Sequence, residues 1–130
     1  MRRRAKMDPK ARQLALAIGA TRLAIGASIL VATRPALQKM GFGRTDASGE
    51  ALAKLGGGRD LALAAMTLAA RDDRQALRTV ILVSGACDAA DAITLGLSAG
   101  HPETRQAGIG GILAGSGAAA ACLWIWRRLS

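Results

Sequence analysis

Charged side chains inside otherwise apolar segments are the feature that most limits how this chain can fold. Its 130 residues include stretches of Ala, Leu, Gly and Ile long enough to cross a bilayer. A charged residue that faces lipid at the middle of a helix costs about 2.5 to 3.5 kcal/mol. We therefore expect these side chains to meet one another inside the protein. The five residues are Arg22, Arg59, Asp60, Asp88 and Asp91.

The composition also favours a membrane protein. Hydrophobic residues make up 51% of the sequence, but aromatic residues make up only 2%, and 16 residues are glycine. Such small side chains fill a water-soluble core poorly, whereas in a membrane they allow helix backbones to approach closely. The charged residues, at 21% of the chain, lie mostly between the apolar stretches. The sequence thus predicts a single all-α membrane domain.

Four apolar stretches predict four transmembrane helices, since about 20 helical residues cross a hydrocarbon core of about 30 Å. The second stretch is the least apolar, because Lys54, the glycines 56–58 and the Arg59-Asp60 pair lie within it. We expect one long helix there, because a helix that began at Gly58 would be only about 20 Å long. The predicted fold is an all-α bundle of four transmembrane helices within residues 13–130, with spans at about 13–33, 49–70, 76–98 and 106–126.

Local signals set the expected helix ends. Ser48 and Asp72 are of the residue types that cap helix N-termini, so we expect them to start the second and third helices. Between the first two spans, Pro35 can begin a short helix that Gly41 and Gly43 would end, and an ordinary mobile loop is the alternative. Such a helix would place its apolar residues at the membrane interface.

Basic residues are unequally distributed between the two sides of this bundle. Lys and Arg favour the cytoplasmic side of a membrane, and the side that holds both termini has more of them. We therefore expect both termini, including a basic segment 1–12, in the cytoplasm, and the protein in the bacterial inner membrane. The net charge of +9 then needs no nucleic acid, and no nucleic-acid-binding motif accompanies it. The cations expected on the cytoplasmic side are Arg2, Arg3, Arg4, Lys6, Lys10, Arg12, Arg71, Arg74, Arg78, Arg127 and Arg128, against Arg34, Lys39, Arg44, Lys54 and Arg105 opposite.

The end of the last span is typical of a membrane interface. Indole rings prefer the depth of the lipid headgroups, and the cations that follow prefer water. We expect this end to be anchored by Trp124, Trp126, Arg127 and Arg128.

Small residues predict where helices touch. Gly19 and Gly26 lie on the same helical face as Arg22, which therefore projects from a stripe that suits close helix contact. The glycines expected to pack helices together are Gly19, Gly26, Gly57, Gly111 and Gly115.

The run GGGRDLALAAMTLAARDDRQAL and the later GACDAADAITLGLSAGH resemble small four-helix integral membrane proteins of bacteria and fungi that are catalogued only as a domain of unknown function. The resemblance covers about the last two-thirds of the chain and implies a membrane bundle. It brings no activity, substrate or cofactor with it. The matching residues are Gly57, Arg59, Asp60 and Leu61 on the second span, then Asp88, Asp91, Gly100 and His101.

Three classes of function are compatible with this sequence. A structural or accessory membrane subunit would use the ion pairs to fix helix packing. A proton- or cation-coupled carrier would use the surplus of intramembrane carboxylates, and so small a chain would need a homo-oligomer to form a pathway. An enzyme acting on a lipid or quinone is the third class, but no catalytic residue, metal site, cofactor motif or phosphate-binding loop supports it.

The surplus itself is a prediction. The spans hold two cations, Arg22 and Arg59, against three carboxylates. An isolated buried charge is neutralised rather than maintained, so we expect one carboxyl to be protonated or to hold a bound cation. Asp88 and Asp91 are one helical turn apart, and we expect them to share that proton.

Overall fold

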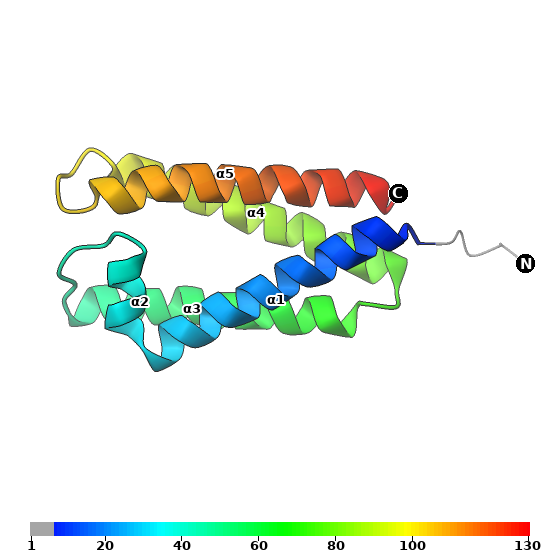
Figure 1. The fold of residues 1–130 in the computed structure, drawn as a ribbon, viewed down its shortest axis with the longest axis horizontal. Coiled ribbons are helices and arrows are strands. Elements are labelled where there is room, and N and C mark those ends of the chain that lie inside the picture. The colour runs from blue at the N-terminus through cyan, green and yellow to red at the C-terminus, as the bar shows by residue number, and fades with distance from the viewer. Residues whose placement is uncertain (1–6) are drawn as a thin grey trace, which may run out of the picture.

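The computed structural model describes residues 7–130, and all regular secondary structure in that range is α-helical (Figure 1). The all-α prediction is therefore correct at this level. The described helices are α1 (Pro9–Val31), α2 (Thr33–Lys39), α3 (Ala47–Ala69), α4 (Arg74–Ser98) and α5 (Arg105–Arg128). The expected basic segment 1–12 lies partly outside the described residues, as do its cations Arg2, Arg3, Arg4 and Lys6.

Aspartates cap α3 and α4, but not at the predicted positions. The Asp46 carboxylate accepts the backbone N–H of Gly49 at 2.8 Å, so α3 begins ahead of Ser48. Asp73 rather than Asp72 caps α4. The Asp72 carboxylate is instead occupied by Arg12 at 2.9 Å, a contact between distant segments that a local pattern cannot reveal. Aspartate suits both caps because its charge also complements the helix dipole.

The short helix expected after the first span is α2. It begins at Thr33, two residues before Pro35, so the proline lies in the first turn, where a missing backbone N–H breaks no helical hydrogen bond. The helix ends at Lys39, and Gly41 follows with a φ of +87°. Glycine adopts this left-handed conformation without a steric penalty, so it can turn the chain back toward α3.

The four long helices run side by side along the molecule, and both described ends of the chain lie at the same end of it (Figure 1). Successive long helices run in opposite directions. Contacts are concentrated within two pairs, α1 with α3 and α4 with α5, and are far fewer between the pairs. The molecule is therefore two helix pairs joined at limited points rather than an evenly packed bundle.

The apolar core lies at the end of the molecule that holds the termini. It combines the start of α1 with the end of α3, the start of α4 and the end of α5. Fully buried side chains there are small or aliphatic, as the scarcity of aromatic residues requires. The core residues are Ala11, Ala15, Ala70, Leu77, Val80, Ile81, Cys122, Ile125 and Leu129.

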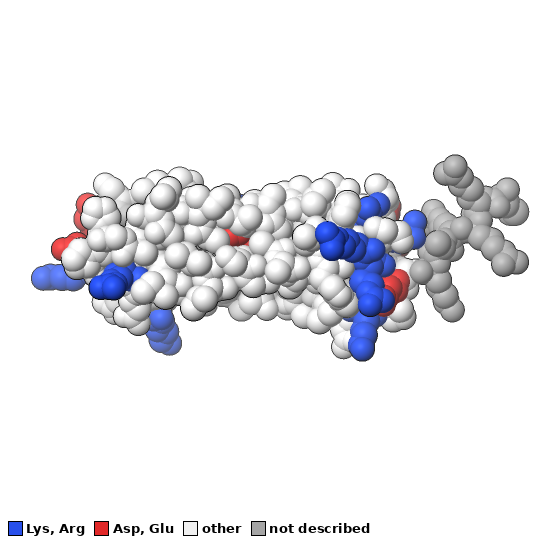
Figure 2. Space-filling model, turned by 90° about the horizontal axis from the view of Figure 1, so that it is seen from above, with Lys and Arg blue, Asp and Glu red and all other residues white. Residues whose placement is uncertain are grey.

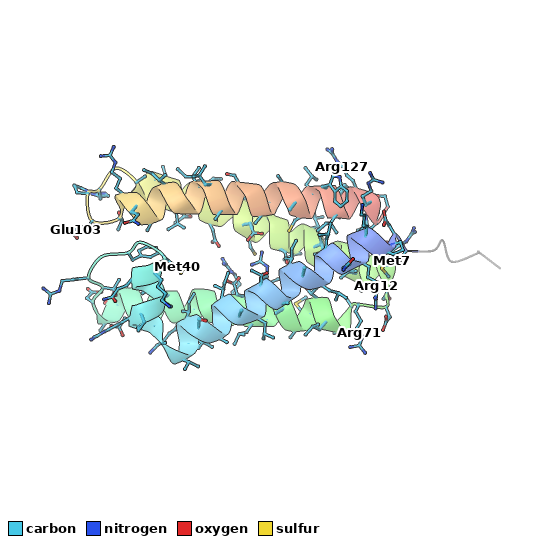
Figure 3. All side chains as sticks on the ribbon, in the orientation of Figure 1. Met7, Arg12, Met40, Arg71, Glu103 and Arg127 are labelled. Atoms are coloured by element: carbon cyan, nitrogen blue, oxygen red, sulfur yellow. The ribbon has the colours of Figure 1, made fainter. Side chains whose placement is uncertain are left out.

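The outer surface is apolar along most of its length. Figure 2 shows an uncharged belt between two ends that carry the Lys and Arg side chains. Large aliphatic side chains are exposed on the long helices, such as Val31 at 88%, Leu97 at 80% and Leu113 at 72%. Figure 3 places Arg12, Arg71 and Arg127 at the end with the termini. Such a surface is suited to lipid and not to water.

Three helices, α1, α4 and α5, are long and apolar enough to cross a membrane, which indicates a membrane protein. Helix α3 is not among them. With 23 residues it is as long as α1, but its sequence contains Lys54 and the Arg59-Asp60 pair. It is nevertheless continuous through the glycines 56–58.

Candidate functional site

Arg22 bridges the two helix pairs. Its guanidinium donates from Nη1 to Oδ1 of Asp60 on α3 at 2.7 Å and from Nη2 to Oδ1 of Asp88 on α4, also at 2.7 Å. Nη2 lies in addition 3.2 Å from the backbone oxygen of Ser84. Arg22 is only 6% exposed. Charge-assisted hydrogen bonds as short as these are the strong class, so α1 is tied to both neighbouring helices at one point.

Arg59 makes a second pairing on the more open side of the cluster. Its Nη1 and Nη2 donate to the two oxygens of Asp91 at 2.8 and 2.6 Å, a bidentate pair between α3 and α4. Nη2 also lies 3.4 Å from Oδ1 of Asp60. The side chains of Arg59 and Asp91 are 36% and 40% exposed, so this pair is less enclosed than the pairs of Arg22.

The structure thus brings the five charged residues into one continuous network. It runs from Asp91 through Arg59, Asp60 and Arg22 to Asp88, and it joins α1, α3 and α4. We expected Asp88 and Asp91 to share a proton, but the network does not pair these two carboxylates with each other. Each of these carboxylates accepts hydrogen bonds from a different arginine.

Some polar atoms of the network have no partner. Among residues 7–130, the Nε atoms of Arg22 and Arg59 and the hydroxyl oxygen of Ser84 are buried without a hydrogen bond. Ser84 is fully buried on α4, one turn before Asp88. A buried polar group without a partner costs about 1 to 3 kcal/mol.

Helix α5 contacts a carboxylate of the network through a thiol. Sγ of Cys122 lies 3.9 Å from Oδ2 of Asp88, which is a weak contact. Cys87 and Cys122 are both free. Within the described residues, no group of three His, Cys, Asp or Glu side chains could hold a metal ion.

A cleft of about 680 Å³ lies between α1 and α5, with three carboxylates of the network on its floor. Helix α1 forms one wall through residues such as Leu14 and Ile18, and α5 forms the other through Ala114, Ala118 and Trp124. In Figure 2, acidic atoms are visible in the middle of the uncharged belt, away from the charged ends. This cleft was not predicted from the sequence, because the alanines and glycines of α5 look the same whether they face lipid or a cavity. The floor residues are Arg22, Asp60, Asp88 and Asp91.

Glycines allow the backbones within the first pair to touch. A Cβ atom on Gly26 would lie 2.6 Å from the backbone oxygen of Gly57, and one on Gly57 would lie 3.2 Å from the oxygen of Gly26. A Cβ on Gly19 would lie 3.0 Å from Cγ2 of Thr67. Gly19, Gly26 and Gly57 are therefore contact points between α1 and α3. Gly19 and Gly26 lie before and after Arg22 on α1.

The second pair is packed in the same way. A Cβ on Gly115 would lie 2.8 Å from the backbone oxygen of Asp88, so α5 approaches α4 directly behind the network. Gly111 faces Leu95 with no room for a side chain. Gly85 and Gly108 have equally close neighbours and were not singled out from the sequence, because glycine is too abundant here for spacing alone to select them.

The aromatic residues at the end of α5 interact with arginines. The Arg78 guanidinium lies 4.3 Å from the ring centre of Trp126, and that of Arg128 lies 5.1 Å from the ring centre of Trp124. Both distances are within the range of a cation–π interaction. Arg127 lies at this end as well (Figure 3).

Comparison with known proteins adds a family but no activity. Neither a curated protein nor a solved structure matches the chain. One family model matches residues 19–126, so the similarity begins within α1 and includes Arg22, which lies outside the two-thirds suggested by the sequence resemblance. Because this match spans most of the chain and contains the whole charge network, the protein belongs to the family described as domain of unknown function DUF4267.

Proposed function

We propose that this protein is an integral membrane protein with four crossings, α1, α3, α4 and α5, and that it acts as a structural or accessory subunit of the bacterial inner membrane. In this role its ion pairs determine which helices pack together. Charged residues that cross-link helices can specify register and partner choice at some cost in stability. The subunit acts on a membrane partner protein or on further copies of itself.

The bridge made by Arg22 carries this proposal. Outside the apolar core, the α1–α3 pair and the α4–α5 pair touch little, and one buried guanidinium there holds Asp60 of the first pair and Asp88 of the second. The same network supports a fourth crossing by α3. Arg59 and Asp60 are paired within the protein, and Lys54, in the first half of the helix, is the charged residue of α3 that is exposed.

The topology can be tested with reporters. We expect a reporter fused at Ser130 to be active on the cytoplasmic side and one inserted within residues 41–49 to be active on the opposite side. Four crossings return the chain to the side on which it began, whereas residues 41–49 follow a single crossing. Fusions with both a cytoplasmic and a periplasmic reporter should give complementary signals. Equal signals at the two sites, or recovery of the untagged chain without detergent, would contradict the four-span arrangement.

The same network favours a second candidate, a proton- or cation-coupled small carrier acting as a homo-oligomer. The observation behind it is the surplus carboxylate on the floor of an open cleft. An ion pathway needs a charge that can be neutralised and regenerated, and a surplus carboxylate in an apolar setting is such a group.

Substitutions of Asp88 and Asp91 separate the two candidates. If the protein is a structural subunit, we expect Asp88→Asn to lower its abundance in membranes severalfold, because a carboxylate that holds Arg22 is lost, and we expect purified protein in vesicles to conduct no protons above the empty-vesicle rate. Quantitative immunoblotting and a pH-sensitive dye inside the vesicles measure these outcomes. A carrier would show proton or cation flux that Asp91→Asn abolishes while abundance stays unchanged.

A further inference from the structure

We propose that the cleft between α1 and α5 binds an amphipathic organic cation taken up from the bilayer, with its positive charge against the carboxylates on the floor and its apolar part between the two helices. This inference rests on the membrane location proposed above but not on the accessory role.

The size and the walls of the cleft suit a small amphipathic molecule. A volume of about 680 Å³ lies within the range of about 300 to 1,000 Å³ that is usual for small-molecule sites. Leu14, Ile18, Ile25 and Leu95 supply aliphatic contacts, and Trp124 adds an aromatic ring that is 41% exposed. Such walls bind hydrocarbon and offer little to a hydrated metal ion.

The sign of the ligand's charge follows from the floor. Two guanidiniums face three carboxylates, so the fully ionised network carries one negative charge in excess, given by two minus three. A buried charge without a partner is unstable in apolar surroundings. A ligand with one positive charge balances the network, whereas an anionic ligand would double the imbalance.

Free acceptor atoms are available for that charge. Arg59 occupies both oxygens of Asp91, but Oδ2 of Asp60 accepts no hydrogen bond from any residue between 7 and 130. Oδ2 of Asp88 has only the weak contact with the Cys122 thiol, at 3.9 Å. Both carboxylates line the cleft, so an ammonium group or other cation could approach an unoccupied oxygen of each.

The position of the cleft determines the route of entry. It runs between two helices that are both apolar enough to span a membrane, and the acidic atoms are visible within the uncharged belt (Figure 2). A ligand therefore reaches the floor from the lipid phase. This selects molecules that partition into membranes, so the cation must carry a substantial apolar part.

The experiment compares two probes of similar size and opposite charge. Tetraphenylphosphonium and tetraphenylborate are measured by equilibrium dialysis against the full-length protein in a neutral detergent. We expect saturable binding of the cation and at least tenfold weaker binding of the anion. Equal affinity for the two probes would overturn the proposal and assign the cleft to lipid acyl chains. Absence of saturable cation binding would also overturn it.

Two variants with a matched control locate the binding. Ala114→Phe puts a large side chain into the cleft from α5, a helix that contributes no residue to the network, and we expect it to weaken cation binding at least tenfold. Ala120→Phe makes the same change at an exposed position of α5 that does not line the cleft, and binding should stay as in the wild type. Asp91→Asn makes the numbers of cations and carboxylates in the network equal, and we expect the affinity for the cation to fall about tenfold.

These outcomes are distinguishable from a failure of the proposed function. Each variant is also checked for membrane insertion, thermal stability and oligomeric state. If Ala114→Phe inserts and melts like the wild type but binds the cation equally well, only the binding proposal fails. If Ala114→Phe changes the oligomeric state while the wild type binds no cation, the cleft is an interface between copies and the binding proposal is wrong.

Discussion

Replacing Arg22 with alanine should lower the free energy of unfolding by about 3 to 5 kcal/mol, the cost of removing one partner from a buried ion pair. The substitution leaves Asp60 and Asp88 without their shared guanidinium, and both are only 9% exposed. It also removes the buried ion pairs that join the two helix pairs. Thermal or denaturant unfolding in detergent, followed by circular dichroism, measures the change.

Two further variants show whether charge is the cause. Arg22→Lys keeps the charge but cannot donate to two carboxylates in the geometry of a planar guanidinium, so we expect an intermediate stability. The triple variant Arg22→Met, Asp60→Asn, Asp88→Asn removes the charges together. It should recover most of the lost stability, because a buried ion pair is often replaced by uncharged groups at little cost. A triple variant as unstable as Arg22→Ala would mean that steric packing, and not unpaired charge, explains the loss.

Gly26→Ala should destabilise the protein by about 1 to 3 kcal/mol, the usual cost of adding a methyl group to a tightly packed contact. The new Cβ would lie 2.6 Å from the backbone oxygen of Gly57. A flexible side chain could move away, but a helix backbone cannot do so without separating α1 from α3. Because Arg22 is one turn away on the same face, that separation would also lengthen its hydrogen bond to Asp60, which is now 2.7 Å.

Gly58→Ala is the matched control. Gly58 also lies within a helix, but a Cβ there would have no neighbouring atom within 4 Å. Alanine is favoured over glycine in a helix interior by about 0.8 to 1.0 kcal/mol, so the melting temperature should stay the same or rise. The measurement is thermal unfolding of both variants under identical detergent conditions. Similar losses of stability in Gly26→Ala and Gly58→Ala would mean that the close contact of Gly26 with Gly57 is not the cause of the destabilisation.

The charge network and the cleft suggest a division of the molecule along its length. The apolar core holds all four long helices together at the end with the termini, through residues such as Leu77, Ile81 and Ile125. Farther along, the pairs are joined by ion pairs and face each other across the cleft. Substitutions of Leu77 or Ile81, which do not line the cleft, should therefore reduce stability alone, whereas a substitution such as Ala114→Phe in the cleft wall should change binding.

Hydrophobicity and charge in the sequence were sufficient to predict the long helices and the buried position of Arg22, Asp60 and Asp88. Both follow from the cost of placing polar groups in an apolar environment, which depends on residue type and spacing. The same reasoning applied to α3, where continuity through residues 56–58 followed from the length that a crossing needs. Helix ends were less predictable, because Asp72 is held by Arg12 from a distant segment and leaves the cap to Asp73.

The tertiary structure alone decided which charges pair and where the molecule is open. Asp88 and Asp91 are neighbours on one helix, yet they pair with arginines from α1 and α3, respectively, since the order and tilt of the helices set which guanidinium is within reach. The cleft was equally invisible, because a face of alanine and glycine on α5 has the same composition whether it contacts lipid, another helix or a ligand. Residue types and spacing along one helix limit what each face can bury, but only the packing of the other helices determines what that face meets.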